Sequence, residues 1–232
     1  MNKKIAAFKA AFPLTIPVLT GYLVLGAAYG ILMDSNGIHL IWIFLSSLFI
    51  YAGSMQFIAA SLITSGFDPL NAFIITLMVN ARHLFYSISM LGKYKGMGKL
   101  KAYLVFALTD ETFSILCSIN PPDGVDKKCF YFFTSALNHC YWITGSVLGG
   151  ILGGMIEINT KGLEFVLTAL FIVILINQWK ATKNHLPAMI GIISAIICRI
   201  FFGSSNFLIP SMLLILILVT TLKDAMERSK LA

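Results

Sequence analysis

The sequence predicts an all-α fold: a polytopic bundle of about seven to eight transmembrane helices that forms a single membrane domain over residues 1–232. Two features of composition predict it, because 58% of the residues are hydrophobic and only 12% are charged. An average soluble domain carries about 25% charged residues. Mean hydropathy is +0.85. The third observation is that apolar stretches long enough to cross a bilayer recur with little polar sequence between them.

Eight apolar stretches are candidate spans, separated by turns rich in Gly, Pro, Asn and Ser. In chain order they cover about residues 13–33, 40–64, 70–91, 102–119, 130–155, 163–180, 186–202 and 207–222. The first resembles a secretory signal, but it is too long for a signal core, and we interpret it as a retained helix. The fourth carries Asp110 and Glu111 in its middle, so it is either a full crossing or a re-entrant or broken helix.

The net charge of +7 is better explained by membrane topology than by nucleic acid, because the lysines are scattered through short connections. Short loops rich in Lys and Arg stay on the cytoplasmic side. With the N-terminus inside and eight full crossings, ten Lys and Arg residues lie inside and five outside. One loop contradicts this topology, since the densest basic cluster would then lie outside: Lys93, Lys95, Lys99 and Lys101.

The two halves of the chain resemble each other, which gives candidate repeats of three helices each over residues 12–91 and 130–203. The matched positions, at a nearly constant offset, are 46–50 with 168–172, Gln56 with Gln178, and Gly26 and Gly30 with Gly145 and Gly149. Many transporters are built from such repeats, with the substrate site between them. The repeats are inverted if the segment between them does not fully cross, and parallel if it does. Chance likeness between apolar helices is the alternative.

Polar and charged side chains recur inside the predicted spans, where a charged residue costs roughly 2.5 to 3.5 kcal/mol on insertion scales. Asn80, His83 and Tyr86 share one helix face. Arg82 suits the carboxylate of a zwitterionic amino acid, and His83 or an acidic residue is a candidate for taking up a coupling proton. The candidate substrate-binding or coupling residues are Gln56, Asn80, Arg82, His83, Tyr86, Asp110, Glu111, Asn138 and His139, with Asp110 or Glu111 facing the substrate ammonium.

A structural interpretation of the same residues stays open. In it, Arg82 lies near the membrane surface and extends its charge to water, while Asp110 and Glu111 pair with it to steady the bundle. Asn177 and Gln178 beside Lys180 are then an ordinary polar helix end. The glycines around Gly149 allow close helix packing.

Three segments carry a family resemblance: YAGSMQFIAASLI from Tyr51, NARHLFYSISM from Asn80 and LTDETFSI from Leu108. In this order and spacing they resemble the AzlC family of branched-chain amino acid permeases, over residues 12–222. The resemblance implies a multi-pass protein of the bacterial cytoplasmic membrane that exports amino acids such as valine or leucine. It also implies a small hydrophobic AzlD-like partner subunit. Met55 departs from the family pattern, where we expect a small residue such as Ala.

We therefore expect an exporter driven by an ion gradient, with no catalytic residue, no metal and no cofactor. The sequence has no metal-ligand spacing, Walker loop or dinucleotide fingerprint. Gly53 and Ser54 lack the G-x-S-x-G elbow of a serine hydrolase. Two alternatives remain: a passive channel or facilitator for small solutes, and a non-transporting scaffold subunit of a membrane complex.

Overall fold

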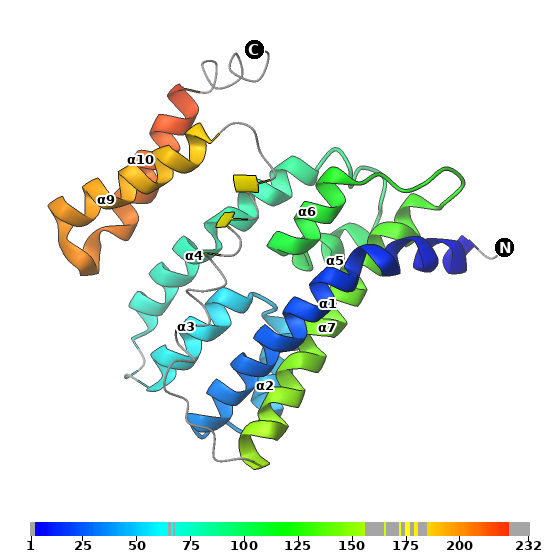
Figure 1. The fold of residues 1–232 in the computed structure, drawn as a ribbon, viewed down its shortest axis with the longest axis horizontal. Helices are drawn as coiled ribbons and strands as arrows, with labels where there is room; N and C mark the ends of the chain where they lie inside the picture. Colours follow the sequence, from blue (N-terminus) through cyan, green and yellow to red (C-terminus); the bar gives the residue numbers. More distant parts are fainter. Residues whose placement is uncertain are drawn as a thin grey trace. The chain divides into compact units, whose positions relative to one another are not determined.

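A computed structural model describes residues 3–64, 66, 68–155, 165, 172, 175–176, 179–180 and 185–222, and the elements that these residues form are α-helices (Figure 1). The all-α prediction is therefore confirmed for the described part of the chain. The chain divides into two compact units, Met1–Leu167 and Thr168–Ala232.

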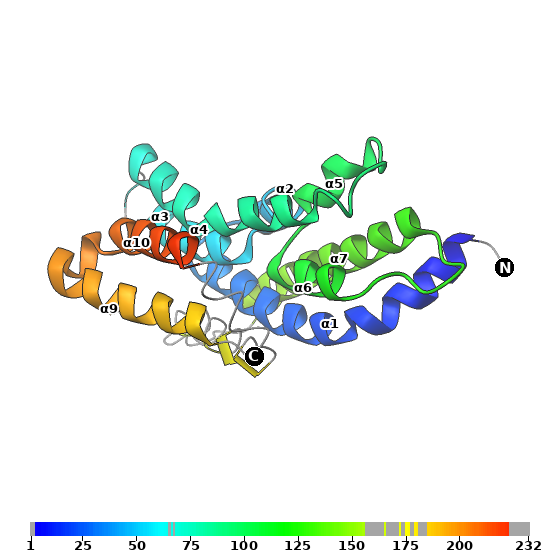
Figure 2. The ribbon, with the colours of Figure 1, turned by 90° about the horizontal axis from the view of Figure 1, so that it is seen from above.

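The first unit is organised around two long helices, α1 (Lys3–Ser35) and α7 (Lys127–Met155). Both views show them side by side (Figures 1 and 2). They run in the same direction, because Gly145 faces Tyr22 and Gly153 faces Asp34. A Cβ atom on Gly145 would lie 2.5 Å from the Tyr22 carbonyl oxygen. The glycines thus allow the two backbones to touch, which is the packing role expected for them.

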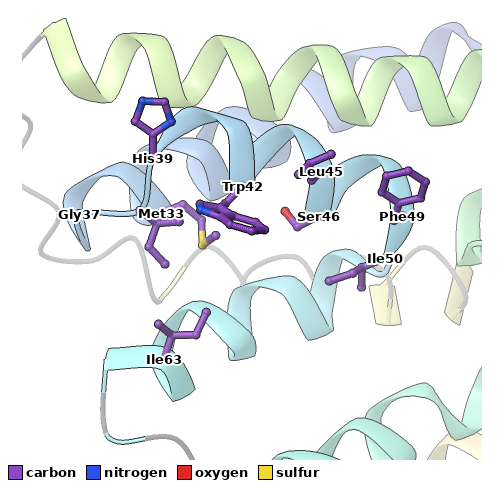
Figure 3. Close-up of a pocket in the computed structure, with 10 residues that line it drawn as sticks. Met33, Gly37, His39, Trp42, Leu45, Ser46, Phe49, Ile50 and Ile63 are labelled. Atoms are coloured by element: carbon purple, nitrogen blue, oxygen red, sulfur yellow. The ribbon is translucent and has the colours of Figure 1, made fainter.

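The expectation of one continuous span over residues 40–64 is wrong. Two short helices occupy this region, α2 (Leu40–Phe49) and α3 (Gly53–Thr64), and the chain turns back on itself between them (Figure 3). Tyr51 adopts a φ of 46°, in the left-handed region that side-chain-bearing residues rarely occupy. This conformation ends α2, and the backbone N–H groups of Ile50 and Tyr51 both donate to the Ser46 carbonyl, at 2.9 and 3.2 Å.

Helix α4 (Pro69–Met90) runs in the direction opposite to α1, because Met90 at its end packs with Ala7 and Ala11 at the start of α1. It begins at Asp68, whose carboxylate accepts hydrogen bonds from the backbone N–H groups of Leu70 and Asn71 at 3.0 and 3.3 Å. The segments before and after Ala81 meet at an angle of 42°. Arg82 therefore lies directly after a bend.

The weak fourth span is broken, which was one of its two expected forms. It consists of α5 (Leu100–Phe106) and α6 (Asp110–Ser118). Thr109 caps α6, and its hydroxyl oxygen accepts from the Thr112 backbone N–H at 3.3 Å. At the other end of α6, the Lys93 ammonium donates to the carbonyl oxygens of Leu116 and Cys117 at 2.7 and 2.8 Å. Because Lys93 precedes α5, this contact closes α5 and α6 into a hairpin.

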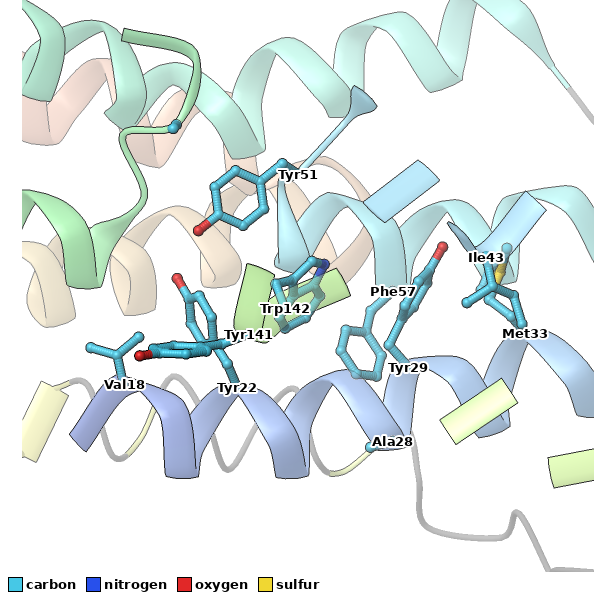
Figure 4. Packing of buried hydrophobic residues seen from close by; sticks show 12 residues of the cluster. Val18, Tyr22, Ala28, Tyr29, Met33, Ile43, Tyr51, Phe57, Tyr141 and Trp142 are labelled. Atoms are coloured by element: carbon cyan, nitrogen blue, oxygen red, sulfur yellow. The ribbon is translucent and has the colours of Figure 1, made fainter. Parts of the chain in front are cut away.

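Two apolar clusters hold these elements against α1 and α7. The first surrounds the middle of α1 and contains Tyr22, Tyr29, Phe57 and Trp142 (Figure 4). The second lies at the N-terminal ends of both long helices and contains Ala7, Ala11, Met90, Tyr94, Met97, Leu104, Leu108, Leu116, Phe130 and Tyr131. At the start of α7, the Asp126 carboxylate accepts from the Cys129 backbone N–H at 2.8 Å, which holds the pKa of this carboxyl below its ordinary value.

The second unit contains α9 (Leu186–Asn206) and α10 (Leu208–Thr221), which are helices at the positions of the last two predicted spans. Gly203 breaks the helical path of α9 with a φ of 75°. The Arg199 guanidinium lies 5.8 Å from the centre of the Phe207 ring. Most of the predicted span 163–180, with Asn177 and Gln178, lies outside the described residues.

Within the described residues, Lys3–Ser35 and Leu186–Gly203 are long and apolar enough to cross a membrane, and α4 is a third if its bent segments form one span. The count of seven to eight spans and the internal repeat stay predictions. The middle of the second copy, residues 156–184, lies mostly outside the described residues.

Candidate functional site

An ion pair joins two of the predicted site residues. The Arg82 Nη1 atom lies 2.8 Å from Asp110 Oδ2, and the two side chains are 28% and 15% exposed. The Nη2 atom of the same guanidinium donates to Ser54 Oγ at 2.6 Å. Arg82 follows the bend of α4, Asp110 is the first residue of α6, and Ser54 is the second residue of α3. Three interrupted helical segments therefore meet at one guanidinium.

An aromatic pair bridges the same two helices beside the ion pair. The Tyr86 ring stacks on the Phe113 ring with centroids 4.5 Å apart and planes at 12°. Tyr86 is four residues after Arg82, and Phe113 is three residues after Asp110, so each shares a helix face with its charged neighbour. His83 meets the Tyr86 ring edge-on at 6.0 Å. The charged groups thus have an apolar wall next to them.

Two side-chain oxygens are buried acceptors: Asp110 Oδ1 within the ion pair, and Asn80 Oδ1 on α4, two residues before Arg82. Among the described residues, neither makes a hydrogen bond. A buried acceptor without a donor costs about 1 to 3 kcal/mol. Both atoms are therefore suited to accept from a bound donor.

Glu111 does not join Arg82, although it is adjacent to Asp110 in the sequence. Its Oε2 atom accepts a hydrogen bond from the Tyr22 hydroxyl of α1, and that hydroxyl also lies 2.8 Å from Thr109 Oγ1. Nearby, the fully buried Asn138 of α7 donates through Nδ2 to Thr112 Oγ1 at 3.0 Å. Glu111 and Asn138 thus belong to a second polar cluster, which links α6 to the two long helices.

His139 joins the α2–α3 turn to α7. Its ring stacks on Tyr51 with centroids 4.2 Å apart. Its Nε2 atom lies 3.3 Å from the Ser47 carbonyl oxygen, and its Nδ1 atom lies 3.4 Å from the Tyr103 hydroxyl. A carbonyl only accepts, so Nε2 carries the proton and Nδ1 accepts from Tyr103. Figure 4 shows the hydroxyl groups of Tyr22 and Tyr51 pointing toward one another.

Gln56 is enclosed by packing and is 1% exposed. The Trp142 Nε1 atom donates to Gln56 Oε1 at 2.9 Å, and Gln56 Nε2 donates to Ser47 Oγ at 3.4 Å. The amide therefore connects α3 to α7 and α2. This geometry favours a structural role for Gln56 over contact with a solute.

Replacing Gln56 by Leu is expected to destabilise the protein by about 1 to 3 kcal/mol, because the Trp142 N–H is left buried without an acceptor. The measurement is thermal unfolding of purified protein in detergent. Combining Gln56→Leu with Trp142→Phe removes both partners and is expected to recover much of the loss. Unchanged stability with selective loss of transport would instead assign Gln56 to the solute.

Sequence reasoning did not propose four residues that complete these contacts: Ser54, Tyr22, Thr109 and Tyr51. Ser54 and Tyr51 lie within the YAGSMQF segment, and Thr109 lies within LTDETFSI, so the motifs were a usable signal for these three. Tyr22 is a single tyrosine in an apolar helix, and nothing in its sequence neighbourhood distinguishes it.

A separate apolar groove of about 760 Å³ lies between the end of α1, α2 and α3 (Figure 3). Its lining is mostly hydrophobic and includes Met33, Trp42, Phe49 and Ile63. No group of three or more His, Cys, Asp or Glu side chains in the described part of the chain could hold a metal ion.

The protein has apolar helices, and an ion pair lies where interrupted helical segments meet. These two features are typical of a helical membrane protein with a polar interior. The chain belongs to the AzlC family, since the AzlC protein family model matches residues 17–156. This family places it among membrane transport proteins rather than enzymes.

Three relatives cover nearly the whole chain. The branched-chain amino acid transport protein AzlC of Bacillus subtilis is 50% identical over 100% of this chain and 92% of its own length. An uncharacterized membrane protein of Helicobacter pylori is 41% identical over 98% of this chain and 100% of its own. An uncharacterized membrane protein of Haemophilus influenzae is 40% identical over 92% of this chain and 88% of its own length. No solved structure is significantly similar to the chain.

Proposed function

We propose that this protein exports branched-chain amino acids across the bacterial cytoplasmic membrane, driven by an ion gradient and paired with a small hydrophobic AzlD-like subunit. The observation that carries the proposal is the Arg82–Asp110 ion pair, completed by Ser54, where three interrupted helical segments meet. The name of the Bacillus subtilis relative supports the class of substrate.

The ion pair offers both charges that a zwitterion requires. The substrate carboxylate binds the Arg82 guanidinium and the Ser54 hydroxyl, near the N-terminus of α3, whose dipole favours negative charge. The substrate ammonium binds Asp110, including the buried Oδ1 atom that otherwise lacks a donor among the described residues. One internal ion pair is thereby exchanged for two, and the net charge of the site does not change.

The aromatic pair explains a preference for an aliphatic side chain. Tyr86 and Phe113 present ring surface on the same helix faces as the two charges. A branched hydrocarbon packed against these rings gains about 0.8 kcal/mol for each buried CH₂. A charged side chain would lose its hydration there without an opposite charge.

The test is transport by purified protein in proteoliposomes, with and without the small subunit. Radiolabelled valine is expected to accumulate against its concentration when a proton or sodium gradient is imposed, and leucine and isoleucine are expected to compete while lysine and glutamate do not. Equilibration without accumulation would assign a passive facilitator. Absence of flux with the small subunit present, from protein that is folded by size-exclusion chromatography, would assign a scaffold subunit.

A further inference from the structure

We propose that α2–α3 and α5–α6 are two re-entrant hairpins that enter the bilayer from opposite faces and meet at Arg82. In this topology the loop over residues 93–101 lies on the same side as the N-terminus. The inference concerns the first unit of the chain and requires only a membrane location. It does not depend on which solute is transported.

The long helices define two ends of the first unit. Helices α1 and α7 run in the same direction. Helix α4 runs the opposite way, because its last residue, Met90, packs in one cluster with Ala7 and Ala11 at the start of α1. Helices α1, α4 and α7 therefore each connect the same two ends.

Helix lengths separate full crossings from half crossings. At about 1.5 Å per residue, the 33, 22 and 29 residues of α1, α4 and α7 reach beyond the roughly 30 Å of a hydrocarbon core. Helix α7 is long enough but less apolar than the other two, and most of its polar side chains are buried against the protein. The 10 and 12 residues of α2 and α3 reach about 15 and 18 Å. The 7 and 9 residues of α5 and α6 reach about 10 and 14 Å. Each short helix therefore reaches only about a third to three fifths of the way across the hydrocarbon core.

The bases of the two hairpins lie at opposite ends. The α2–α3 base is at the end of α1, where Met33 and Ile38 line the same groove as Ile63 at the end of α3 (Figure 3). The α5–α6 base is at the start of α1, where Lys93 holds the end of α6 and Tyr94 packs in the cluster that contains Ala7.

The tips of the hairpins meet between these ends. Tyr51 at the α2–α3 tip lies 6.2 Å from the Phe106 ring at the α5–α6 tip, and Tyr22 from the middle of α1 lies 2.8 Å from Thr109. Irregular backbone at membrane depth requires burial inside protein. Tyr51, Ala107 and Thr109 meet this requirement, with 3%, 0% and 9% of their surface exposed.

The lysines give the orientation. All nine lysines between residues 3 and 155 lie at the end that holds the N-terminus: Lys3, Lys4, Lys9, Lys93, Lys95, Lys99, Lys101, Lys127 and Lys128. The described residues at the opposite end include Asp34 at the end of α1, His39 and Asp68. The positive-inside rule therefore assigns the lysine-bearing end to the cytoplasm. The basic cluster that contradicts eight full crossings agrees with this topology.

The topology gives the site two separate supports. Ser54 belongs to the hairpin from the outer face, and Asp110 belongs to the hairpin from the cytoplasmic face. Arg82 of the spanning helix α4 bonds to both. Loss of the contact to Ser54 leaves the contact to Asp110 in place, and the reverse also holds.

The experiment is cysteine labelling of the full chain with a membrane-impermeant maleimide, after the four native cysteines are replaced by Ser or Ala. The reporters are exposed loop positions: Lys95→Cys and Asp123→Cys on either side of α5–α6, and Asn36→Cys after α1. We expect Lys95→Cys and Asp123→Cys to react in inside-out vesicles only, and Asn36→Cys in right-side-out vesicles only.

Labelling of Lys95→Cys and Asp123→Cys from opposite sides would overturn the inference, because α5–α6 would then be a full crossing. Labelling of Asn36→Cys from the same side as Lys95→Cys and Asp123→Cys would also overturn the inference. Lys99→Cys and Pro122→Cys report the same two loops if a first variant fails to insert. The expected labelling in a protein that transports nothing would refute the proposed function and leave the topology intact.

Discussion

Valine transport by Arg82→Gln is expected to fall at least about 100-fold. The change removes the cation that binds the substrate carboxylate, and it leaves the largely buried Asp110 carboxylate without its partner. A hydrogen bond to a charged group contributes about 1.5 to 3 kcal/mol, so loss of the guanidinium contacts to the substrate carboxylate costs about 3 kcal/mol, and each 1.4 kcal/mol is a factor of ten. Arg82→Lys is expected to be intermediate, since an ammonium keeps the charge but lacks the planar fork that reaches Asp110 and Ser54 together. The measurement is initial rate of valine flux in proteoliposomes.

A double variant separates the functional from the structural interpretation of this pair. Arg82→Gln with Asp110→Asn removes both charges, so thermal stability is expected to return toward the wild-type value while transport stays absent. If the pair only steadies the bundle, stability and transport should recover together. Recovery of both in the double variant would contradict the proposed role.

Gly149→Ala is expected to destabilise the protein by at least about 1 to 3 kcal/mol, which is a large effect for the addition of one methyl group. The added Cβ would overlap the backbone of Ala27, which cannot move without separating α1 from α7. The measurement is the midpoint of thermal unfolding in detergent, together with the folded fraction after extraction.

Gly21→Ala is the matched control, because a Cβ on Gly21 would meet no atom within 4 Å. In a helix interior, Ala is also favoured over Gly by about 1 kcal/mol. Gly21→Ala is therefore expected to leave stability unchanged or raised. Equal behaviour of the two variants would show that the α1–α7 contact does not depend on close glycine packing.

The helices were predictable from the sequence where a long run of hydrophobic residues determines their position. Helices α1, α7, α9 and α10 follow from long hydrophobic runs, and the interruption between α5 and α6 follows from two adjacent acids in an apolar segment. The α2–α3 turn was missed because it depends on a positive φ at Tyr51, a residue type with no preference for that conformation. The tertiary contacts of Tyr51 with His139 stabilise this conformation, and a local pattern does not contain them.

The candidate site was predictable only in part, because some of its contacts depend on tertiary structure that a local sequence pattern does not contain. A guanidinium inside a membrane span requires an opposite charge, so a contact between Arg82 and one of the two adjacent acids follows from electrostatics. Electrostatics does not predict which of the two adjacent acids makes the contact. Successive residues on a helix point about 100° apart, so the orientation of α6 determines which acid faces Arg82. The same holds for Gln56, which is held by Trp142 from a distant helix.

Equilibrium binding of radiolabelled valine to the purified protein, with its small subunit, tests most directly whether Arg82, Asp110 and Ser54 hold the substrate. The wild-type protein is expected to bind valine saturably, with displacement by leucine. The stable double variant Arg82→Gln with Asp110→Asn is expected to bind at least about 100-fold more weakly, from the loss of two charge-assisted contacts. Wild-type affinity in that variant would contradict the account and place the solute elsewhere in the protein.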